Sequence, residues 1–281
     1  MRTRAPGILA GVVGLGLAIG AGSGSAAGSD TRAATCRVFL VPGAFGPGSG
    51  GAAYFVTSEQ YFAEYREFFL KKGCAVKVGV FPPDGTIEER ALVFRDQLEK
   101  FSREQGSPVW VVAHSQGALD VRFALKTLKV SGVTAVATIG APHQGTPLSD
   151  WVIDQRNRGS VLYWAMRVLA DYDLRELRFA PELSSGFLEK HRGRFLAVPG
   201  VRYGSARAVC KTGCSRLVGW VGRWVGVGEG DGLIPGESQK WGEDLGEFDL
   251  DHLSEIAVDP EKRAERLRLL ERIQAFFSAK I

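Results

Sequence analysis

The chain has 281 residues, of which 45% are apolar and 23% are charged, and its formal net charge is +4. This composition is typical of globular proteins, and the length suffices for one large domain. The positive charge is too small and too evenly mixed with acidic residues to indicate nucleic-acid binding.

The first 27 residues predict a secretory signal peptide. A basic start, MRTR, precedes an uncharged, glycine-rich apolar run, and the small residues of SGSAAGSD follow. This is the layout of an exported leader, with cleavage after Ala26 or Ala27. An uncleaved anchor is the alternative, but the run is shorter than the roughly 20 residues that a comfortable membrane span needs. We therefore expect a secreted protein with a short N-terminal segment (28–36) and one domain (37–281).

Strand-like and helix-like patterns then alternate along the chain. Short β-branched runs predict buried strands, and apolar residues at helical spacing predict the segments between them as helices. Such alternation implies right-handed crossovers and a mostly parallel sheet with helices on both faces, an α/β architecture. The predicted strands are 37–42, 74–82, 108–115 and 133–140, and the predicted helices are 58–73, 86–106 and 117–128.

The alternation stops after Pro147. Residues 148–190 contain no clear strand and predict a helical cap, in which the apolar stretch near 161–170 is either a mobile lid or a fixed cover. A strand over 194–205, an irregular Gly- and Trp-rich segment over 213–230, a short strand near 246–250 and a charged helix from about Pro260 complete the chain. Within the irregular segment, we expect a cluster to pack in the core rather than bind an acyl chain: Leu217, Trp220, Val221 and Trp224.

The stretch AHSQG places Ser115 between a predicted strand and a predicted helix, with the small residues Ala113 and Gly117 two positions to either side. A nucleophilic serine on a tight strand-to-helix turn needs this layout. It also needs a histidine to accept its proton and a carboxylate to orient that histidine. The motif alone is weak, since alanine replaces the usual first glycine.

The chain has four histidines. His114 adjoins Ser115 along the strand and should point away from it, while His143 and His191 are interpreted as surface or structural residues. His252 lies late in the chain, before the last helix, where hydrolases with the order Ser, acid, His carry the base. His252 is therefore the predicted base.

Asp231 is the predicted acid, because it stands between glycines in EGDGLIP, ahead of His252. Glu229, Asp249 and Asp251 remain competitors, although Asp251 adjoins His252 and reaches its ring with difficulty. An oxyanion hole needs two backbone N–H groups. Gln116 supplies one, and the glycine-rich loop over 41–51 supplies the other.

A dinucleotide site is rejected. GPGSGG (46–51) matches G-x-G-x-x-G, but the acidic residue expected about 20 positions later would fall inside a helix.

Four cysteines in an exported chain favour two disulfides. Cys210 and Cys214 are close enough in sequence to close a tight loop. That leaves Cys36 with Cys74, each at the start of a predicted strand. Four reduced thiols are the alternative.

The stretches AHSQGALDVRFAL, TIGAPHQGTPLSDWV, EGDGLIPGES and LDHLSEI resemble, in order and spacing, the secreted bacterial triacylglycerol lipases, over roughly residues 37–256. The resemblance implies an α/β-hydrolase fold with a cap or lid, and cleavage of lipid esters through an acyl-enzyme. It makes Ser115 the nucleophile, Asp231 the acid and His252 the base, with the oxyanion on the N–H groups of Ala44 and Gln116. It also implies action at a lipid–water interface and, as in many relatives, a secretion foldase.

The sequence departs from that family at a few positions. Pro42 replaces a histidine of the oxyanion loop, and Ala113 replaces a glycine. Ser254 stands where many relatives carry an aspartate that ligates calcium, and a serine hydroxyl is a poor ligand for that cation. We therefore expect no metal or other cofactor, and a monomer. A short-chain carboxylesterase or a polyhydroxyalkanoate-type depolymerase is the alternative enzyme, and a non-catalytic lipid- or surface-binding relative is the alternative of another class.

Overall fold

The computed structural model describes residues 34–45, 61–106, 108–154, 159–160, 177–256 and 259–279. The predicted signal peptide, the GPGSGG stretch and the lid near 161–170 lie outside these residues. None of the described helices is both long and apolar enough to span a bilayer.

Six strands form one parallel sheet in the order β2-β1-β3-β4-β5-β6. Because all strands run in the same direction, their carboxyl ends meet along one edge, where crevices for ligands form in such sheets. The strands are β1 (Cys36–Val41), β2 (Cys74–Val78), β3 (Val109–His114), β4 (Val133–Ile139), β5 (Arg202–Ala208) and β6 (Glu243–Phe248).

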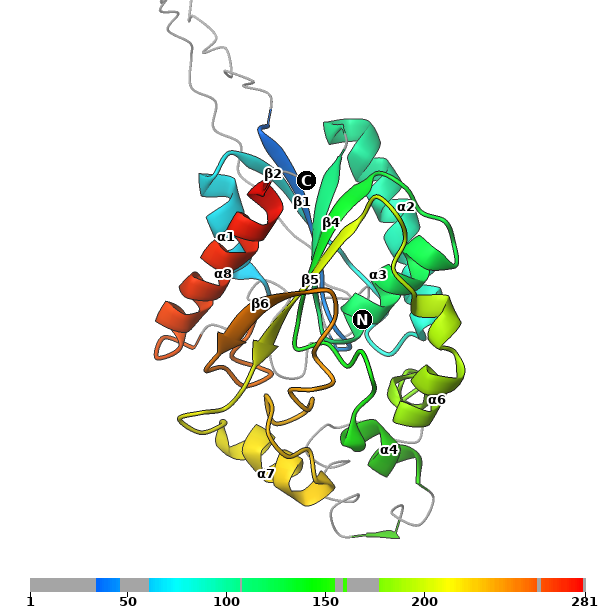
Figure 1. The fold of residues 1–281 in the computed structure, drawn as a ribbon, viewed down its shortest axis with the longest axis vertical. Coiled ribbons are helices and arrows are strands. Elements are labelled where there is room, and N and C mark those ends of the chain that lie inside the picture. Colours follow the sequence, from blue (N-terminus) through cyan, green and yellow to red (C-terminus); the bar gives the residue numbers. More distant parts are fainter. Residues whose placement is uncertain are drawn as a thin grey trace, which may run out of the picture. The chain divides into compact units, whose positions relative to one another are not determined.

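Helices cover both faces of the sheet. The helices α2 (Ile87–Gln105) and α3 (Gln116–Lys126) lie on one face, and α1 (Ala63–Lys71) and α8 (Arg263–Ser278) lie on the other (Figure 1). Successive side chains of a strand point to opposite faces of the sheet, and those of β1 pack against both layers of helices. Phe39 packs with Phe94 of α2, whereas Leu40 belongs to the core cluster that includes Leu270 of α8. The predicted parallel α/β sandwich is therefore confirmed.

The predicted start of α2 is also confirmed. Thr86 caps the helix by accepting a hydrogen bond from the Glu89 N–H, and the Glu89 side chain accepts one from the Thr86 N–H. This reciprocal capping box satisfies two backbone donors at the helix start.

Both predicted disulfides are present, Cys36–Cys74 and Cys210–Cys214. Cys36 and Cys74 are paired residues at the starts of the neighbouring strands β1 and β2, so the bridge fixes their register. The second bridge closes a short loop before helix α7 (Arg216–Val225).

Helical segments lie between β4 and β5 in the described part of the chain. They are α4 (Pro147–Ile153), the 3₁₀ helix η3 (Ala180–Leu183), α6 (Ser185–Lys190) and the 3₁₀ helix η4 (Arg192–Phe195). Figure 1 shows α4 and α7 beyond the carboxyl ends of the strands.

Two predictions from sequence were wrong here. The strand expected from residue 194 begins only at Arg202, because Pro199 and Gly200, which has a positive φ of 81°, form a turn before it. The segment over 213–230, expected to be irregular, contains α7. Glycines lower helix propensity, but a Cβ on Gly222 would lie 2.3 Å from the Gly232 carbonyl oxygen, so close packing requires glycine there.

Candidate active site

Ser115 occupies a strained turn between β3 and α3. Its φ of 54° and ψ of −131° lie in a region that residues with a side chain rarely adopt. The turn packs tightly against the end of β1. A Cβ on Gly117 would lie 2.6 Å from the Pro42 carbonyl oxygen, and one on Gly43 would lie 2.7 Å from the Ser115 Cβ. Ala113 is fully buried in β3, so alanine is accommodated where the family pattern has glycine.

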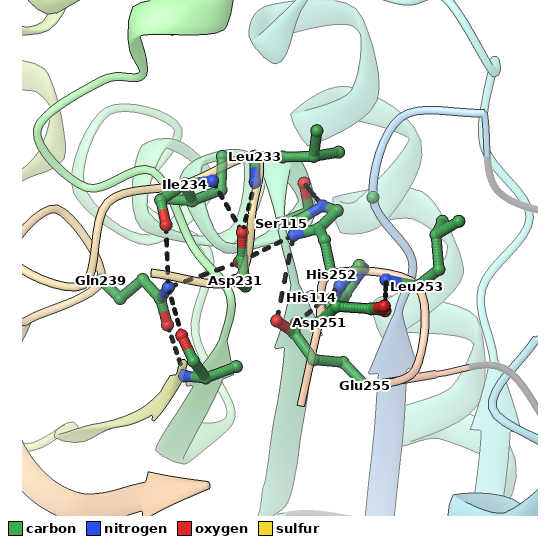
Figure 2. Close-up of polar contacts among 12 residues, drawn as sticks. His114, Ser115, Asp231, Leu233, Ile234, Gln239, Asp251, His252, Leu253 and Glu255 are labelled. Atoms are coloured by element: carbon green, nitrogen blue, oxygen red, sulfur yellow. Dashed lines mark hydrogen bonds and ion pairs between the residues drawn. The ribbon is translucent and has the colours of Figure 1, made fainter. Parts of the chain in front are cut away.

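The structure brings Ser115, His252 and Asp231 together at the carboxyl edge of the sheet. His252 Nε2 is 3.1 Å from Ser115 Oγ, and His252 Nδ1 is 2.9 Å from Asp231 Oδ2 (Figure 2). The backbone N–H of His252 also donates to the Asp231 carbonyl. The loop of Asp231 therefore holds both the ring and the backbone of the histidine.

The Asp231 carboxylate is completely buried and accepts further hydrogen bonds. Its Oδ1 accepts from the backbone N–H groups of Leu233 at 2.8 Å and Ile234 at 2.7 Å. Its Oδ2 accepts from Gln239 Nε2 at 3.3 Å, so donors converge on it from its own loop (Figure 2). Buried carboxylates need such partners, and these fix the direction in which Asp231 faces His252.

The competing acids lie in other environments. Asp249 accepts hydrogen bonds from the backbone of Lys211 and Thr212. Asp251 accepts from the Ser215 N–H and from the backbone just after it, and Glu229 is exposed. Among the described residues, Asp231 is thus the acid that contacts His252 at hydrogen-bond distance.

The other histidines have structural contacts. His114 does not point away from the site as predicted, since its ring lies 4.7 Å from that of His252. Its nitrogens face Tyr61 and Glu255 rather than Ser115. His143 is buried, with its ring nitrogens 2.8 Å from Arg122 Nη1 and 3.0 Å from Thr138 Oγ1.

Glu255 is a residue of the site that the sequence analysis missed. It is completely buried, with Oε2 2.9 Å from His114 Nε2 and Oε1 3.9 Å from His252 Nδ1. Burial, followed by the charge of Asp231 and a hydrogen bond with it, raises the pKa of Glu255 well above its usual range. Burial lowers the pKa of His114 well below its usual value. Both shifts favour the neutral forms at neutral pH.

The potential metal ligands of the site are already engaged. His114, His252 and Glu255 place possible ligand atoms within 4.8 Å of one another. A metal ion bound there would displace His252 from Ser115 or Asp231. Ser254, at the position of the family's calcium ligand, uses its hydroxyl within the turn, where it accepts from the Asp251 N–H and donates to the Asp251 carbonyl.

Two further buried side chains fix the loop after β1. The Tyr61 hydroxyl accepts a hydrogen bond from the Gly43 N–H at 2.7 Å and lies 2.8 Å from His114 Nδ1. Arg90 of α2 donates to the carbonyls of Pro42 and Gly43. The sequence held a signal for Arg90, because it lies three residues after Ile87 and four before Phe94, on the apolar face of a predicted helix.

Ala44 and Gln116, the predicted oxyanion donors, lie on opposite sides of Ser115 in the chain. Ala44 lines the same cavity as Ser115 and His252, and Gln116 is the first residue of α3. The Gln116 side chain donates to the Gly85 carbonyl, so it is held away from the nucleophile turn.

A cavity of about 240 Å³ opens beside Ser115 and His252. Aliphatic and aromatic side chains form most of its wall, and they come from the helical insertion, from α7 and from the Asp231 loop: Leu148, Val152, Leu177, Phe179, Leu183, Leu217, Val218, Val221, Leu233 and Ile234. The candidate catalytic groups therefore face an apolar space.

Comparison with known proteins adds a sequence relative. No protein-family model matches the chain. Triacylglycerol lipase 2 of Saccharomyces cerevisiae is 29% identical over 215 residues, which cover 70% of this chain and 62% of the yeast protein. The chain thus matches less than two thirds of the length of this relative.

Solved structures share the architecture. The mature lipase of Bacillus licheniformis superposes with a TM-score of 0.59 at 20% identity, covering 79% of this chain and 86% of that one. A metagenomic carboxyl esterase superposes with a TM-score of 0.66 at 19% identity, covering 86% and 75%. The chain has the α/β-hydrolase fold. In this fold the turn after a central strand projects one side chain above the sheet, and here that side chain is Ser115.

Gly117→Ala should destabilise the protein. The added Cβ would meet the Pro42 and Val41 carbonyls, which are backbone atoms and cannot turn aside. We expect a loss of about 1–3 kcal/mol in the free energy of unfolding, measured in urea. Gly186→Ala in α6 is the control, because a Cβ there meets nothing within 4 Å. It should be neutral or slightly stabilising, and equal effects of the two changes would contradict the packing argument.

Glu255→Gln should alter how stability depends on pH. Because the pKa of Glu255 is raised on folding, the folded state keeps a proton that the unfolded chain loses above about pH 4.3. The contribution of Glu255 to the free energy of unfolding should therefore fall as pH rises, by up to about 1.4 kcal/mol per pH unit. Glutamine does not titrate, so it removes this fall. The free energy of unfolding of the variant, measured in urea, should therefore rise relative to that of the wild type between pH 4 and pH 7.

The control for this comparison is Glu104→Gln, at an exposed position of α2. The difference in free energy of unfolding between this control and the wild type should vary far less over the same pH range. A constant offset for Glu255→Gln would show that Glu255 titrates alike in the folded and unfolded chains.

Proposed function

We propose that the chain is a serine hydrolase that cleaves the carboxylic ester bonds of lipids, as a triacylglycerol lipase does. The observation that carries the proposal is the chain of contacts from Ser115 Oγ through His252 to Asp231, beside an apolar cavity. The similarity to a yeast triacylglycerol lipase supports it.

In the first step of this mechanism, Ser115 Oγ attacks the ester carbonyl and its proton passes to His252 Nε2. The 3.1 Å separation of these atoms suits that transfer. The Asp231 carboxylate, 2.9 Å from Nδ1, selects the tautomer that carries its proton on Nδ1 and leaves Nε2 free to accept. It then stabilises the imidazolium.

The negative charge that develops on the carbonyl oxygen needs fixed donors. We assign this role to the backbone N–H groups of Ala44 and Gln116. Tyr61 and Arg90 support the assignment, because they hold the peptide groups just before Ala44. His252 returns its proton to the leaving alcohol, then activates a water that releases the acid from Ser115.

The cavity favours a long acyl chain over a short one. Its wall is almost wholly apolar, and each buried methylene contributes about 0.8 kcal/mol to binding. A short-chain esterase is the second candidate, because a carboxyl esterase has the same fold.

We also propose that the protein works outside the cytoplasm. Both pairs of cysteines form disulfides, which persist in oxidising compartments. Recovery of the natural protein solely from the cytoplasm, with its first residues intact, would refute this.

A chain-length series of p-nitrophenyl esters tests the function. A lipase should prefer acyl chains of eight or more carbons and gain rate above the solubility limit of its substrate, whereas an esterase should do neither. Ser115→Ala serves as the blank, and a repeat with a chelator tests for metal dependence. Absence of hydrolysis of every ester by the folded wild-type protein would leave only a binding role.

A further inference from the structure

Helix α7 presents an exposed surface of mixed aromatic and basic character, which we call the α7 outer face: Arg216, Leu217, Trp220, Arg223 and Trp224. Trp224 is 62% exposed, Trp220 is half-buried, and their ring centroids are 6.0 Å apart. This corrects the prediction that the tryptophans pack in the core. Contiguous exposed patches of apolar side chains, rather than single ones, mark interaction surfaces.

The residues of this face are ordered around the helix. At 3.6 residues per turn, Arg223 and Arg216 lie at one margin, Trp220 and Trp224 lie next, and Leu217 follows, all within about a third of the circumference. Leu217 also lines the cavity beside Ser115. The face therefore changes from basic to aromatic to apolar in the direction of the candidate active site.

The two arginines of this face carry charge that no acidic residue in the described part of the chain neutralises. Neither Arg216 nor Arg223 forms an ion pair with another residue in the described part of the chain. Two lysines of other loops differ, since Lys211 pairs with Glu247 and Lys240 pairs with Glu237. The arginines border a shallow hollow with Leu217 and Trp220, so their charge is available to an anionic partner.

The opposite face of α7 is firmly held. Val218, Gly219, Val221 and Gly222 are buried. The Cys210–Cys214 bridge and the hydrogen bond from the Ser215 N–H to Asp251 fix the start of the helix. The α7 outer face is thus a preformed platform, and docking need not first order it.

We propose that the α7 outer face docks on an anionic lipid surface. Arginines attract acidic headgroups, tryptophan rings sit at the boundary between headgroups and acyl chains, and leucine side chains enter the hydrocarbon. The order of these residue types around α7 matches that gradient. Docked in this way, the helix brings Leu217, which belongs both to this face and to the cavity wall, to the lipid surface. The proposal concerns binding and does not require that Ser115 acts as a nucleophile.

Vesicle sedimentation tests the charge contribution. The full chain carrying Ser115→Ala, which prevents hydrolysis, is mixed with vesicles of phosphatidylglycerol or of phosphatidylcholine alone. We expect stronger binding to phosphatidylglycerol, weakened by 0.5 M salt. Arg216→Gln with Arg223→Gln should reduce that binding about 30-fold, since each basic side chain near an anionic surface contributes roughly fivefold. The matched control, Lys100→Gln with Arg103→Gln on α2, removes the same charge from another helix and should change little.

Trp224→Ala tests the aromatic contribution and should weaken binding to phosphatidylglycerol about tenfold. Leu267→Ala, at an exposed apolar position of α8, is its control. Equal binding to the two kinds of vesicle, no binding to either, or equal effects of the α7 and control variants would overturn the proposal. Hydrolysis of a soluble short-chain ester, measured in the active background, should be unchanged by the α7 substitutions. A failure of docking is thereby distinguished from a failure of the proposed hydrolase function.

Discussion

The close approach between the end of β1 and the turn before α3 is the constraint on which the site depends. A Cβ on Gly117 would lie only 2.6 Å from the Pro42 carbonyl oxygen, and one on Gly43 only 2.7 Å from the Ser115 Cβ. This contact keeps Ser115 in its strained conformation and sets the loop of Ala44 beside it. Arg90 strengthens the constraint from α2 by donating hydrogen bonds to the carbonyls of that loop.

Around this turn the sheet gathers polar groups from distant parts of the chain. His252 follows Ser115 by 137 residues, yet parallel strands end at one edge, and the loops after them meet there. Asp231, Glu255 and His114 are all buried, which would be costly if they were unpaired. The backbone N–H groups of the Asp231 loop offset the cost of burying the carboxylate by donating hydrogen bonds to it. Neutral forms of Glu255 and His114 reduce it for the other two. A site arranged in this way is organised before substrate arrives.

Some parts of this arrangement can be predicted from the sequence, and others cannot. The alternation of strands and helices predicted the parallel sheet, and the strand starts at Cys36 and Cys74 predicted their bridge, because both features follow from local pattern. Motif order identified Ser115, His252 and Asp231 as the groups to bring together. Glu255 could not be predicted, since a lone glutamate after a histidine resembles any surface acid until the fold buries it. Helix α7 was missed because glycine lowers helix propensity, whereas tertiary packing against Gly232 requires Gly222.

The central claim is that Ser115 and His252 act as one catalytic unit. The measurement that tests it most directly is kcat for Ser115→Ala, His252→Ala and the double variant on one soluble ester, with folding checked by urea unfolding. Each single change should lower kcat by at least about 10⁴-fold, and the double change should cost little more, because either loss disables the same step. Losses that multiply independently, or a His252→Ala enzyme with nearly full activity, would contradict the account.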